Sequence, residues 1–323
     1  MPTGNALTLL FVMDPIQTVN IREDTTFALM LEAQRRGHRV YYADPDDLGV
    51  DRGRVVALAA PVVLRREPGR HVDVGPRERL DLDAQVDVAF QRKDPPVDAA
   101  YIAATQVLGV CRRTLVLNRP SSILAFNEKL FALHFADLMP PTIVTRDIAE
   151  LRGFMAEIGG ELVVKPLGGR GGEGVFVVSA SDRNLGSILE QATDFGRRRA
   201  MGQQFLPAVR EGDKRILLLE GEPLGALLRV PAKGEFRANL HVGGAGARGV
   251  LDDADRRIVE RLAPELRREG LFFVGIDVIG GRLTEINVTS PTCIQEIDAI
   301  DGVCLETQVI ERVELRAAER RGE

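Results

Sequence analysis

A glycine-rich loop, GGRGGEG at residues 168–174, follows the strand-like run ELVVK that ends at Lys165. Gly169, Gly171 and Gly174 match the spacing of the dinucleotide-binding fingerprint, which requires a helix directly after the glycines. Here the apolar run VFVV follows instead. We therefore expect the loop to join two antiparallel strands and to cover phosphates with its backbone amides, with Lys165 as a cation beside them. A flexible hairpin without a ligand is the alternative for the loop taken alone.

Three oxygen-bearing side chains near the C-terminus are spaced so that one cation could bind them all. Glu285 and Asn287 are two residues apart on an expected strand and share a face, and a turn at Gly280-Gly281 would bring Asp277 alongside. Carboxylates together with nucleotide phosphates are ligands that suit Mg²⁺. Three solvated polar positions are the alternative, but the apolar neighbours FFVGIDVI and LTEINV oppose it because buried carboxylates are costly unless paired.

Three further segments each have a functional and an ordinary interpretation. The run NVTSPT, 287–292, places hydroxyls at a strand-to-helix turn, where they could bind a substrate carboxylate or simply cap the helix. Arg92 opens RKDPP after a strand, at the edge where open α/β sheets bind ligands, or lies in a turn stiffened by prolines. Residues 231–249 form either an exposed linker or a basic mobile lid over anionic substrates.

The composition is that of an ordinary globular protein. The 323 residues are 45% apolar and 28% charged, enough for two or three domains. A net charge of −5 argues against a general nucleic-acid binder, and no run reaches the roughly 18 apolar residues of a membrane span. The apolar N-terminal run lacks a basic segment and a cleavage site, so we expect a strand rather than a signal peptide.

Cysteine, histidine and lysine are all sparse. Three scattered cysteines and four scattered histidines give neither a disulfide framework nor a metal-ligand pattern, so we expect buried thiols and a cytoplasmic enzyme. Arginine supplies 37 of the 42 basic residues. Because lysine and arginine are not interchangeable at a tight site, each lysine is a weak candidate for a functional cation. The lysines are Lys93, Lys129, Lys165, Lys214 and Lys233.

Hydrophobic patterns divide the chain into three stretches. The first alternates strands and helices, which predicts a parallel α/β sheet: strands at 7–12, 39–43, 54–64, 86–91 and 114–117, helices at 25–36 and 98–111. The second is a small α+β unit: helices at 127–138, 148–158 and 183–194, strands at 142–145, 161–165, 174–179 and 200–205. The third has strands at 215–221, 223–230, 272–279 and 282–288, a helix at 253–268 and two C-terminal helices.

Several motifs together resemble the prokaryotic glutathione synthetases of the ATP-grasp superfamily. They are NEKLF, ELVVKPLGGRGGEG, EGDKR and LTEINVTSPTCI, joined by the N-terminal FVMDPIQTVNIREDTTFALMLEAQRRG and the turn QRKDPPVD, so the similarity runs from about residue 7 to about residue 315.

The resemblance implies an α/β protein with the ATP-grasp fold. An N-terminal α/β (pre-ATP-grasp) domain would cover 1–120, and a small α+β lid domain 121–204. A C-terminal α+β domain with an antiparallel sheet would cover 205–323 and carry the mobile loop 231–249, with ATP between the last two domains.

The resemblance also implies roles for individual residues. Those at ATP are Lys129 and Lys165 on the phosphates, Gly169, Gly171 and Gly172 in the loop above them, Gln203, Gln204 and Leu206 around adenine, and Asp213 at the ribose. Those at Mg²⁺, with Mn²⁺ as an alternative metal, are Asp277, Glu285 and Asn287. Those near the acyl phosphate are Arg215, Arg229 and Arg237, and those near the substrate carboxylates are Arg92, Asn239, Ser290 and Thr292.

The implied reaction joins γ-glutamylcysteine to glycine and converts ATP to ADP and phosphate through an acyl phosphate. Phosphoryl transfer depends on positioning and charge neutralisation, which suits lysines, arginines and a metal and needs no catalytic cysteine or histidine. The expected partners are the small acid and amino-acid substrates, with further copies of the chain in a dimer or tetramer.

The sequence also departs from the family pattern. Gln295 stands where arginine is usual, Gln204 where asparagine is common, and His241 where a small residue is usual. The departures concern the substrate more than the reaction, so we expect the ATP chemistry to be retained. The alternative is a ligase that joins glutamate or a γ-glutamyl acid to a different amino acid. A nucleotide-binding protein without catalysis would be expected to lose the metal carboxylates or the phosphate lysines, and all are present.

Overall fold

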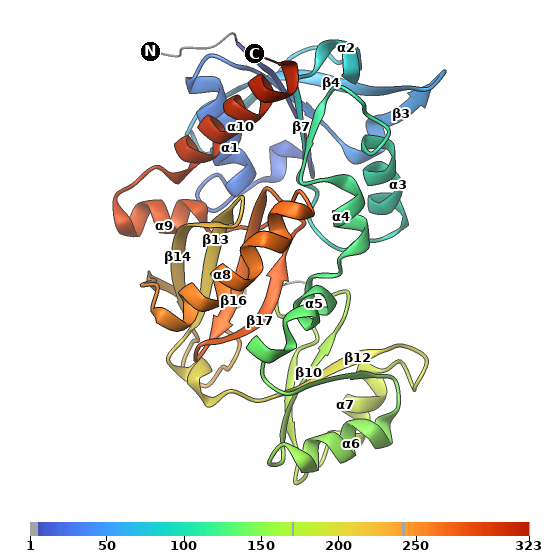
Figure 1. Ribbon diagram of the computed structural model, residues 1–323, viewed down its shortest axis with the longest axis vertical. Coiled ribbons are helices and arrows are strands. Elements are labelled where there is room, and N and C mark those ends of the chain that lie inside the picture. Colours follow the sequence, from blue (N-terminus) through green and yellow to red (C-terminus); the bar gives the residue numbers. More distant parts are fainter. Residues whose placement is uncertain (1–5, 170, 241–242, 323) are drawn as a thin grey trace.

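Three β-sheets follow one another along the longest axis of the molecule (Figure 1). They are seen in a computed structural model that describes residues 6–169, 171–240 and 243–322. The chain begins in the N-terminal sheet, continues to a small sheet at the opposite end of the molecule, and returns to a five-stranded sheet between them. The last helix, α10 (Leu305–Arg321), then packs beside the first, α1 (Thr25–Arg35) (Figure 1).

The N-terminal sheet has eight strands, in the order β3-β4-β2-β1-β7-β8 with β5 and β6 paired to β4. Its strands are β1 (Thr8–Val12), β2 (Arg39–Ala43), β3 (Leu48–Asp51), β4 (Arg54–Leu64), β5 (Val72–Val74), β6 (Glu78–Asp81), β7 (Val88–Gln91) and β8 (Leu115–Leu117). The pairs of β1 with β2 and β7, and of β7 with β8, are parallel as predicted. Every residue of β1 is buried, which explains its continuous apolar sequence.

Helices and short 3₁₀ turns surround this sheet. They are α1, α2 (Leu82–Gln85), α3 (Ala99–Leu108), α4 (Pro120–Ala125) and the 3₁₀ turns at Ile16–Thr18 and Pro45–Asp47. Asp24 caps α1, since its side chain accepts a hydrogen bond from the backbone N–H of Phe27. Five short elements were not expected from the sequence: β3, β5, β6, α2 and α4. The three strands form by pairing with β4, and a local sequence pattern does not predict such pairing.

The small sheet has four antiparallel strands in the order β11-β10-β12-β9. These are β9 (Thr142–Thr145), β10 (Glu161–Pro166), β11 (Phe176–Ser179) and β12 (Ala200–Gln204), and they pack with α6 (Ile148–Glu157) and α7 (Leu185–Ala192). The helix predicted at 127–138 is instead the one-turn α5 (Glu128–Phe131) followed by 3₁₀ turns at Ala132–Leu138. The backbone of Phe135 is not helical there, with φ −123° and ψ 43°, so the predicted continuous helix is wrong.

The five-stranded sheet is antiparallel and has the order β15-β14-β13-β16-β17. Its strands are β13 (Asp213–Leu219), β14 (Glu222–Val230), β15 (Ala245–Arg248), β16 (Phe273–Ile279) and β17 (Arg282–Asn287). The helices of this part are α8 (Asp253–Arg268), α9 (Ile294–Asp301) and the 3₁₀ turn Pro207–Arg210. β15 lies inside the stretch 231–249 that the sequence suggested to be irregular, because its residues pair with β14.

The structure bears on two expectations drawn from composition, the burial of the cysteines and the length of apolar segments. Cys293 is buried, but Cys111 is partly exposed and Cys304 is exposed just before α10, so the expectation of three buried thiols is wrong. None of the helices in the described part of the chain is long and apolar enough to cross a membrane.

Candidate active site

One cavity of about 630 Å³ lies where the three sheets meet. It is lined by every site residue expected from the sequence, although these residues come from segments as far apart as 92 and 292. They are Arg92, Lys129, Lys165, Gly169, Gly171, Gly172, Gln203, Gln204, Leu206, Asp213, Arg215, Arg229, Arg237, Asn239, Asp277, Glu285, Asn287, Ser290 and Thr292. The tertiary fold therefore unites all of them in one place.

Two lysines enter this cavity from different elements. Lys129 lies in α5, whose first turn is capped by the side chain of Asn127, and its Nζ is 2.9 Å from an oxygen of Glu285 and 2.9 Å from the carbonyl oxygen of Gly169. Lys165 lies on β10, and its Nζ donates to Oε1 of Gln203 at 2.8 Å.

The protein environment shifts the two lysine pKa values in opposite directions. Burial lowers the pKa of Lys165 and outweighs the opposing negative charge of Glu285, and the positive charge of Lys129 lowers this pKa as well. Burial also acts to lower the pKa of Lys129, but its ion pair with Glu285 outweighs this and raises it. No carboxylate of the described residues forms an ion pair with Lys165, so its position favours an anionic ligand.

The glycine-rich loop connects β10 with β11, an antiparallel pair as predicted, and Arg170 within it lies outside the described residues. Gly172 has φ +83°, and a Cβ there would lie 2.9 Å from Oδ1 of Asn239. The loop therefore packs closely against the segment that carries Arg237 and Asn239. His241, a departure noted in the sequence, also lies outside the described residues.

Two arginines neutralise a carboxylate at the centre of the cavity. Nε and Nη2 of Arg215 donate to the two oxygens of Asp277 at 2.6 and 3.0 Å, and Arg229 Nη2 is 3.0 Å from Oδ1 of the same group. These charges hold the pKa of Asp277 well below its usual range although burial opposes the shift. Arg229 also donates to Asp213 Oδ2 at 2.6 Å.

Two buried polar atoms beside this cluster have no partner among the described residues: Oδ1 of Asp213 and Nε of Arg229. Unsatisfied buried polar atoms are rare in native proteins. Their position in the wall of a cavity indicates a polar ligand, with Asp213 able to accept a hydrogen bond from a hydroxyl group.

The expected metal ligands are adjacent. Asp277 on β16 pairs in register with Glu285 on β17, and Nδ2 of Asn287 is 3.4 Å from Oδ2 of Asp277. Among the described residues no group of three or more His, Cys, Asp and Glu could hold a metal, so the candidate set combines two carboxylates with an amide. Oxygen donors of this kind suit a hard cation such as Mg²⁺.

The other end of the cavity joins the N-terminal and C-terminal parts of the chain. Arg92 is 5% exposed, and it donates from Nε to Thr26 Oγ1 at 3.0 Å and from Nη2 to the carbonyl of Pro291 at 2.9 Å. Ser290 in turn donates to the carbonyl of Arg92 at 3.3 Å. Thr292 lines the cavity beside this junction.

Glu128 is a residue that the sequence analysis missed. One of its oxygens accepts hydrogen bonds from the backbone N–H groups of Val288 and Thr289, at 2.9 and 3.1 Å, and from the Thr289 hydroxyl at 2.8 Å. It thereby fixes the turn that leads to Ser290. Its place beside Lys129 in the NEKLF motif was the available signal.

Apolar lining residues were also missed: Val163, Phe205, Val209 and Ile279. Val163 and Ile279 lie on strands, Phe205 follows β12, and Val209 lies in the 3₁₀ turn Pro207–Arg210. The sequence alone does not distinguish such apolar residues from those of the core.

Comparison with known proteins gives a family. The sequence model of the prokaryotic glutathione synthetase N-terminal domain matches residues 7–123, and that of the prokaryotic glutathione synthetase ATP-grasp domain matches 128–302. The glutathione synthetase of Xanthomonas campestris is 45% identical over 317 residues, which cover 97% of this chain and 100% of the relative. That of Vibrio parahaemolyticus is 43% identical over 94% of this chain and 97% of the relative. The chain belongs to the prokaryotic glutathione synthetase family.

Solved structures show the same fold at lower sequence similarity. The D-cycloserine synthetase DcsG has a TM-score of 0.67 at 15% identity, covering 95% of this chain and 99% of that one. The ATP-grasp ligase PsnB, complexed with a precursor peptide and AMPPNP, has a TM-score of 0.60 at 15% identity, covering 98% and 99%. The predicted ATP-grasp fold is therefore confirmed, and as a member of the prokaryotic glutathione synthetase family the chain is an ATP-dependent ligase.

The two segments matched by the family models contribute unequally to the cavity. All the expected site residues except Arg92 come from the segment that matches the family's ATP-grasp domain. Arg92 comes from the segment matching the N-terminal domain.

Proposed function

We propose that the cavity binds ATP and two small substrates and joins γ-glutamylcysteine to glycine, giving glutathione, ADP and phosphate. The observation that carries this proposal is that all the residues expected for the reaction line one cavity. The unpartnered atoms of Asp213 and Arg229 add support from the structure alone.

ATP lies between the small sheet and the five-stranded sheet. Lys129 and Lys165 neutralise its phosphates, and the amides of Gly169, Gly171 and Gly172 cover them from above. Gln203, Gln204 and Leu206 bind the adenine, with the apolar side chains near them, and Oδ1 of Asp213 accepts from a ribose hydroxyl.

Glu285, Asn287 and the neighbouring carboxylate of Asp277 would hold Mg²⁺, or Mn²⁺ in its place. When bound, the metal neutralises phosphate charge during transfer. The structure supplies the donor set: two carboxylates in register and an amide on the same face of β17 as Glu285.

The proposed reaction has two steps, phosphoryl transfer and then formation of the amide bond. An oxygen of the donor carboxylate attacks the γ-phosphorus of ATP and ADP leaves, which forms an acyl phosphate. The amine of the acceptor then attacks the acyl carbon, losing a proton, and phosphate leaves. Arg215, Arg229 and Arg237 stabilise the negative charge that develops on the transferred group, while Arg92, Asn239, Ser290 and Thr292 hold the substrate carboxylates.

The domain boundaries proposed from the sequence fit this arrangement. The small domain 121–204 acts as a lid over a C-terminal domain 205–323, and the loop 231–249 covers the substrates of the N-terminal domain 1–120. Closing these parts excludes water, which would otherwise hydrolyse the acyl phosphate.

A second candidate is a ligase that joins glutamate or a γ-glutamyl acid to a different amino acid. Gln295 favours it: this departure from the family pattern is buried at the junction that carries the substrate end of the cavity.

Phosphate release from ATP and Mg²⁺, measured across a panel of γ-glutamyl acids, glutamate and amino acids, tests both candidates. Release that depends on γ-glutamylcysteine and glycine supports glutathione formation. Release with glutamate and a free amino acid, but not with that pair, selects the second candidate. If no pair of substrates in the panel stimulates release, both proposed substrate pairs are wrong.

We also propose that the enzyme works in the cytoplasm as a homo-oligomer, a dimer or a tetramer. The support is the family, whose members make a soluble metabolite from small substrates. Light scattering of the purified chain over a range of concentrations gives its mass in solution, and a mass of one chain throughout would contradict the oligomer.

A further inference from the structure

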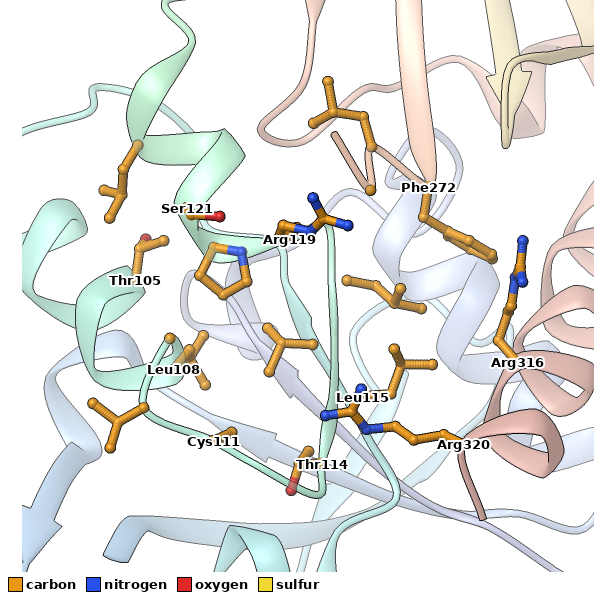
Figure 2. A pocket seen from close by; sticks show the side chains of 18 of the residues that line it. Thr105, Leu108, Cys111, Thr114, Leu115, Arg119, Ser121, Phe272, Arg316 and Arg320 are labelled. Atoms are coloured by element: carbon orange, nitrogen blue, oxygen red, sulfur yellow. The ribbon is translucent and has the colours of Figure 1, made fainter. Parts of the chain in front are cut away.

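A second cavity, of about 700 Å³, shares no lining residue with the candidate active site. It lies between α3, α4 and β8 on one side and the turn before β16 together with α10 on the other (Figure 2). In the described part of the chain β8 pairs with β7 alone, so this cavity lies beside an edge strand of the N-terminal sheet.

The floor of this cavity is apolar. Leu117, Leu271 and Phe272 line it and are 6%, 1% and 4% exposed, and Leu115 and Leu124 line it with larger exposed fractions. Such a surface stabilises a bound apolar group by removing it from water. The volume falls within the roughly 300–1,000 Å³ of small-molecule sites.

Two arginines at the cavity lack an acidic partner. Nη1 of Arg119 donates to the carbonyl of Arg268 at 2.9 Å, and Nε and Nη2 of Arg320 donate to the carbonyls of Arg113 and Arg112 at 2.7 Å each. No carboxylate forms an ion pair with either guanidinium within the described ranges. Figure 2 shows Arg320 extending from α10 toward Leu115, with Arg119 across the cavity.

The other two arginines of the lining have a different environment. Arg316 forms ion pairs with Glu220 and Glu319, and Arg267 forms one with Glu222, so both charges are already neutralised. Of the four arginines that line the cavity, Arg119 and Arg320 are therefore the two without an ion pair to a described carboxylate, in a chain whose net charge is negative. This imbalance is complementary to an anion.

Gly270 makes the position of Arg119 possible. It has φ +62°, and a Cβ there would lie 2.7 Å from Nε and 2.9 Å from Cζ of Arg119. The guanidinium therefore lies directly on the glycine backbone, and its Nη1 bond to Arg268 keeps it there. Nε and Nη2 of Arg119 have no acceptor in the described part of the chain and remain available to a ligand.

We propose that this cavity is a second ligand site, for a small anion with an apolar body, such as an aromatic or acyl carboxylate or sulfonate. The apolar part lies on Leu115, Leu271 and Phe272, and the anionic group binds Arg119 or Arg320, which face the cavity from different sides. Charge-assisted hydrogen bonds from guanidinium are strong, so the anion contributes specificity as well as affinity. The proposal concerns binding alone and does not depend on the proposed reaction.

The probe that tests this is 8-anilinonaphthalene-1-sulfonate, whose fluorescence rises in an apolar site, compared with the neutral N-phenyl-1-naphthylamine of similar shape. We expect one sulfonate bound per chain, with the same affinity with and without saturating ATP and Mg²⁺. The double variant Arg119→Gln/Arg320→Gln should weaken sulfonate binding at least about tenfold and change binding of the neutral probe less than about twofold. Arg199→Gln, which removes an exposed arginine from the small domain, should have no effect.

Gly270→Ala provides a second variant that removes no charge. The new methyl group displaces Arg119, so we expect sulfonate binding to weaken while the melting temperature confirms folding. Unchanged sulfonate affinity in the double variant would overturn the proposal, as would displacement of the probe by ATP. Loss of probe binding as chains associate would show instead that a second copy covers the cavity.

Discussion

At the scale of single residues, Lys165 and Lys129 differ in what surrounds them. Lys129 has a carboxylate partner in Glu285, whereas Lys165 donates to the neutral amide of Gln203. We therefore expect a bound phosphate to contribute more to neutralising the charge of Lys165 than that of Lys129. Arginine replaces lysine nearly everywhere else in this chain, so these two ammonium groups stand out already in the sequence.

Replacing Lys165 by methionine removes the ammonium but keeps most of the side-chain length. We expect kcat/KM for ATP to fall at least about a hundredfold, which corresponds to roughly 2.7 kcal/mol of lost stabilisation. Steady-state kinetics of phosphate release measure this. Arg199→Met removes an exposed cation before β12 and serves as the control, so equal losses in both variants would contradict a specific role for Lys165.

The lowered pKa of Lys165 predicts a pH dependence of ATP binding. As pH rises through this pKa, which lies below the ordinary 10.5, Lys165 loses its charge and the KM for ATP increases. In Lys165→Arg the guanidinium stays charged, so the KM should be flat over the same alkaline range even if its value is higher. A profile of the same steepness in both enzymes would contradict the assignment.

At the scale of elements, the glycine-rich loop and the segment around Asn239 must fit against each other. Gly172→Ala places a methyl group 2.9 Å from Asn239 Oδ1 in a backbone with φ +83°. We expect a lower kcat and a higher KM for ATP, because the loop no longer lies over the phosphates. The control is Gly159→Ala, which has φ +98° and open space around it, and so carries the backbone strain of about 1 kcal/mol alone. If both variants lose activity equally, contact with Asn239 is not the cause.

A second pair of elements, α1 and α9, meets through Gln295. This buried side chain donates from Nε2 to the carbonyl of Asp24 at 2.6 Å and accepts from Nη1 of Arg66 at 2.6 Å. Asp24 caps α1 at the substrate end of the cavity. Gln295 therefore positions α1 relative to the turn that carries Thr292.

Gln295→Ala should raise the KM of the acid or amino-acid substrate about five- to twentyfold, equivalent to roughly 1–2 kcal/mol, with little change in the KM for ATP. Arg66→Ala should act in the same direction, and the double variant should cost less than the two added together. Gln34→Ala, which breaks two bonds to the backbone of Leu64 away from the cavity, is the control. A change in the KM for ATP as large as that for the substrate would contradict this positioning role.

At the scale of the whole molecule, the two ends of the sequence pack together. Arg36, just after α1, forms an ion pair with Glu314 of α10 at 2.7 Å. At the junction of α9 and α10, the half-buried carboxyl group of Asp298 lies beside that of Glu306. Burial, followed by the interaction with the Glu306 carboxyl group, raises the pKa of Asp298 from 3.8 to about 8.

A raised pKa means that the folded state holds a proton that the unfolded state has lost. Stability from this group is therefore present at low pH and declines as pH rises from 3.8 toward 8. Asp298→Asn removes the ionisation and should be more stable than the parent at pH 9 by about 1 kcal/mol, a value reduced for the solvent exposure of the group. The two should be similar near pH 5.

Urea unfolding at both pH values measures this difference. Glu306→Gln should stabilise in the same direction, because it removes the other member of the pair. An advantage of Asp298→Asn that is the same at both pH values would contradict the raised pKa.

The sequence by itself determined the order of most elements, the strand-loop-strand character of residues 161–179 and the chemical types gathered in the cavity. It could do so because strand and helix periods, helix caps and glycine spacing are local, and because the motifs are long. It did not reveal β3, β5 and β6, or β15 within 231–249, since these strands exist only through pairing with partners elsewhere in the chain.

Only the tertiary structure decided which groups meet. It turned Asp277 toward Arg215 and Arg229, paired Lys129 with Glu285 but Lys165 with the amide of Gln203, and placed Glu128 against the turn at Thr289. It also placed Arg119 and Arg320 beside one apolar cavity although about two hundred residues separate them. The physical reason is that charge pairing and desolvation depend on distances in space, which a single sequence does not contain.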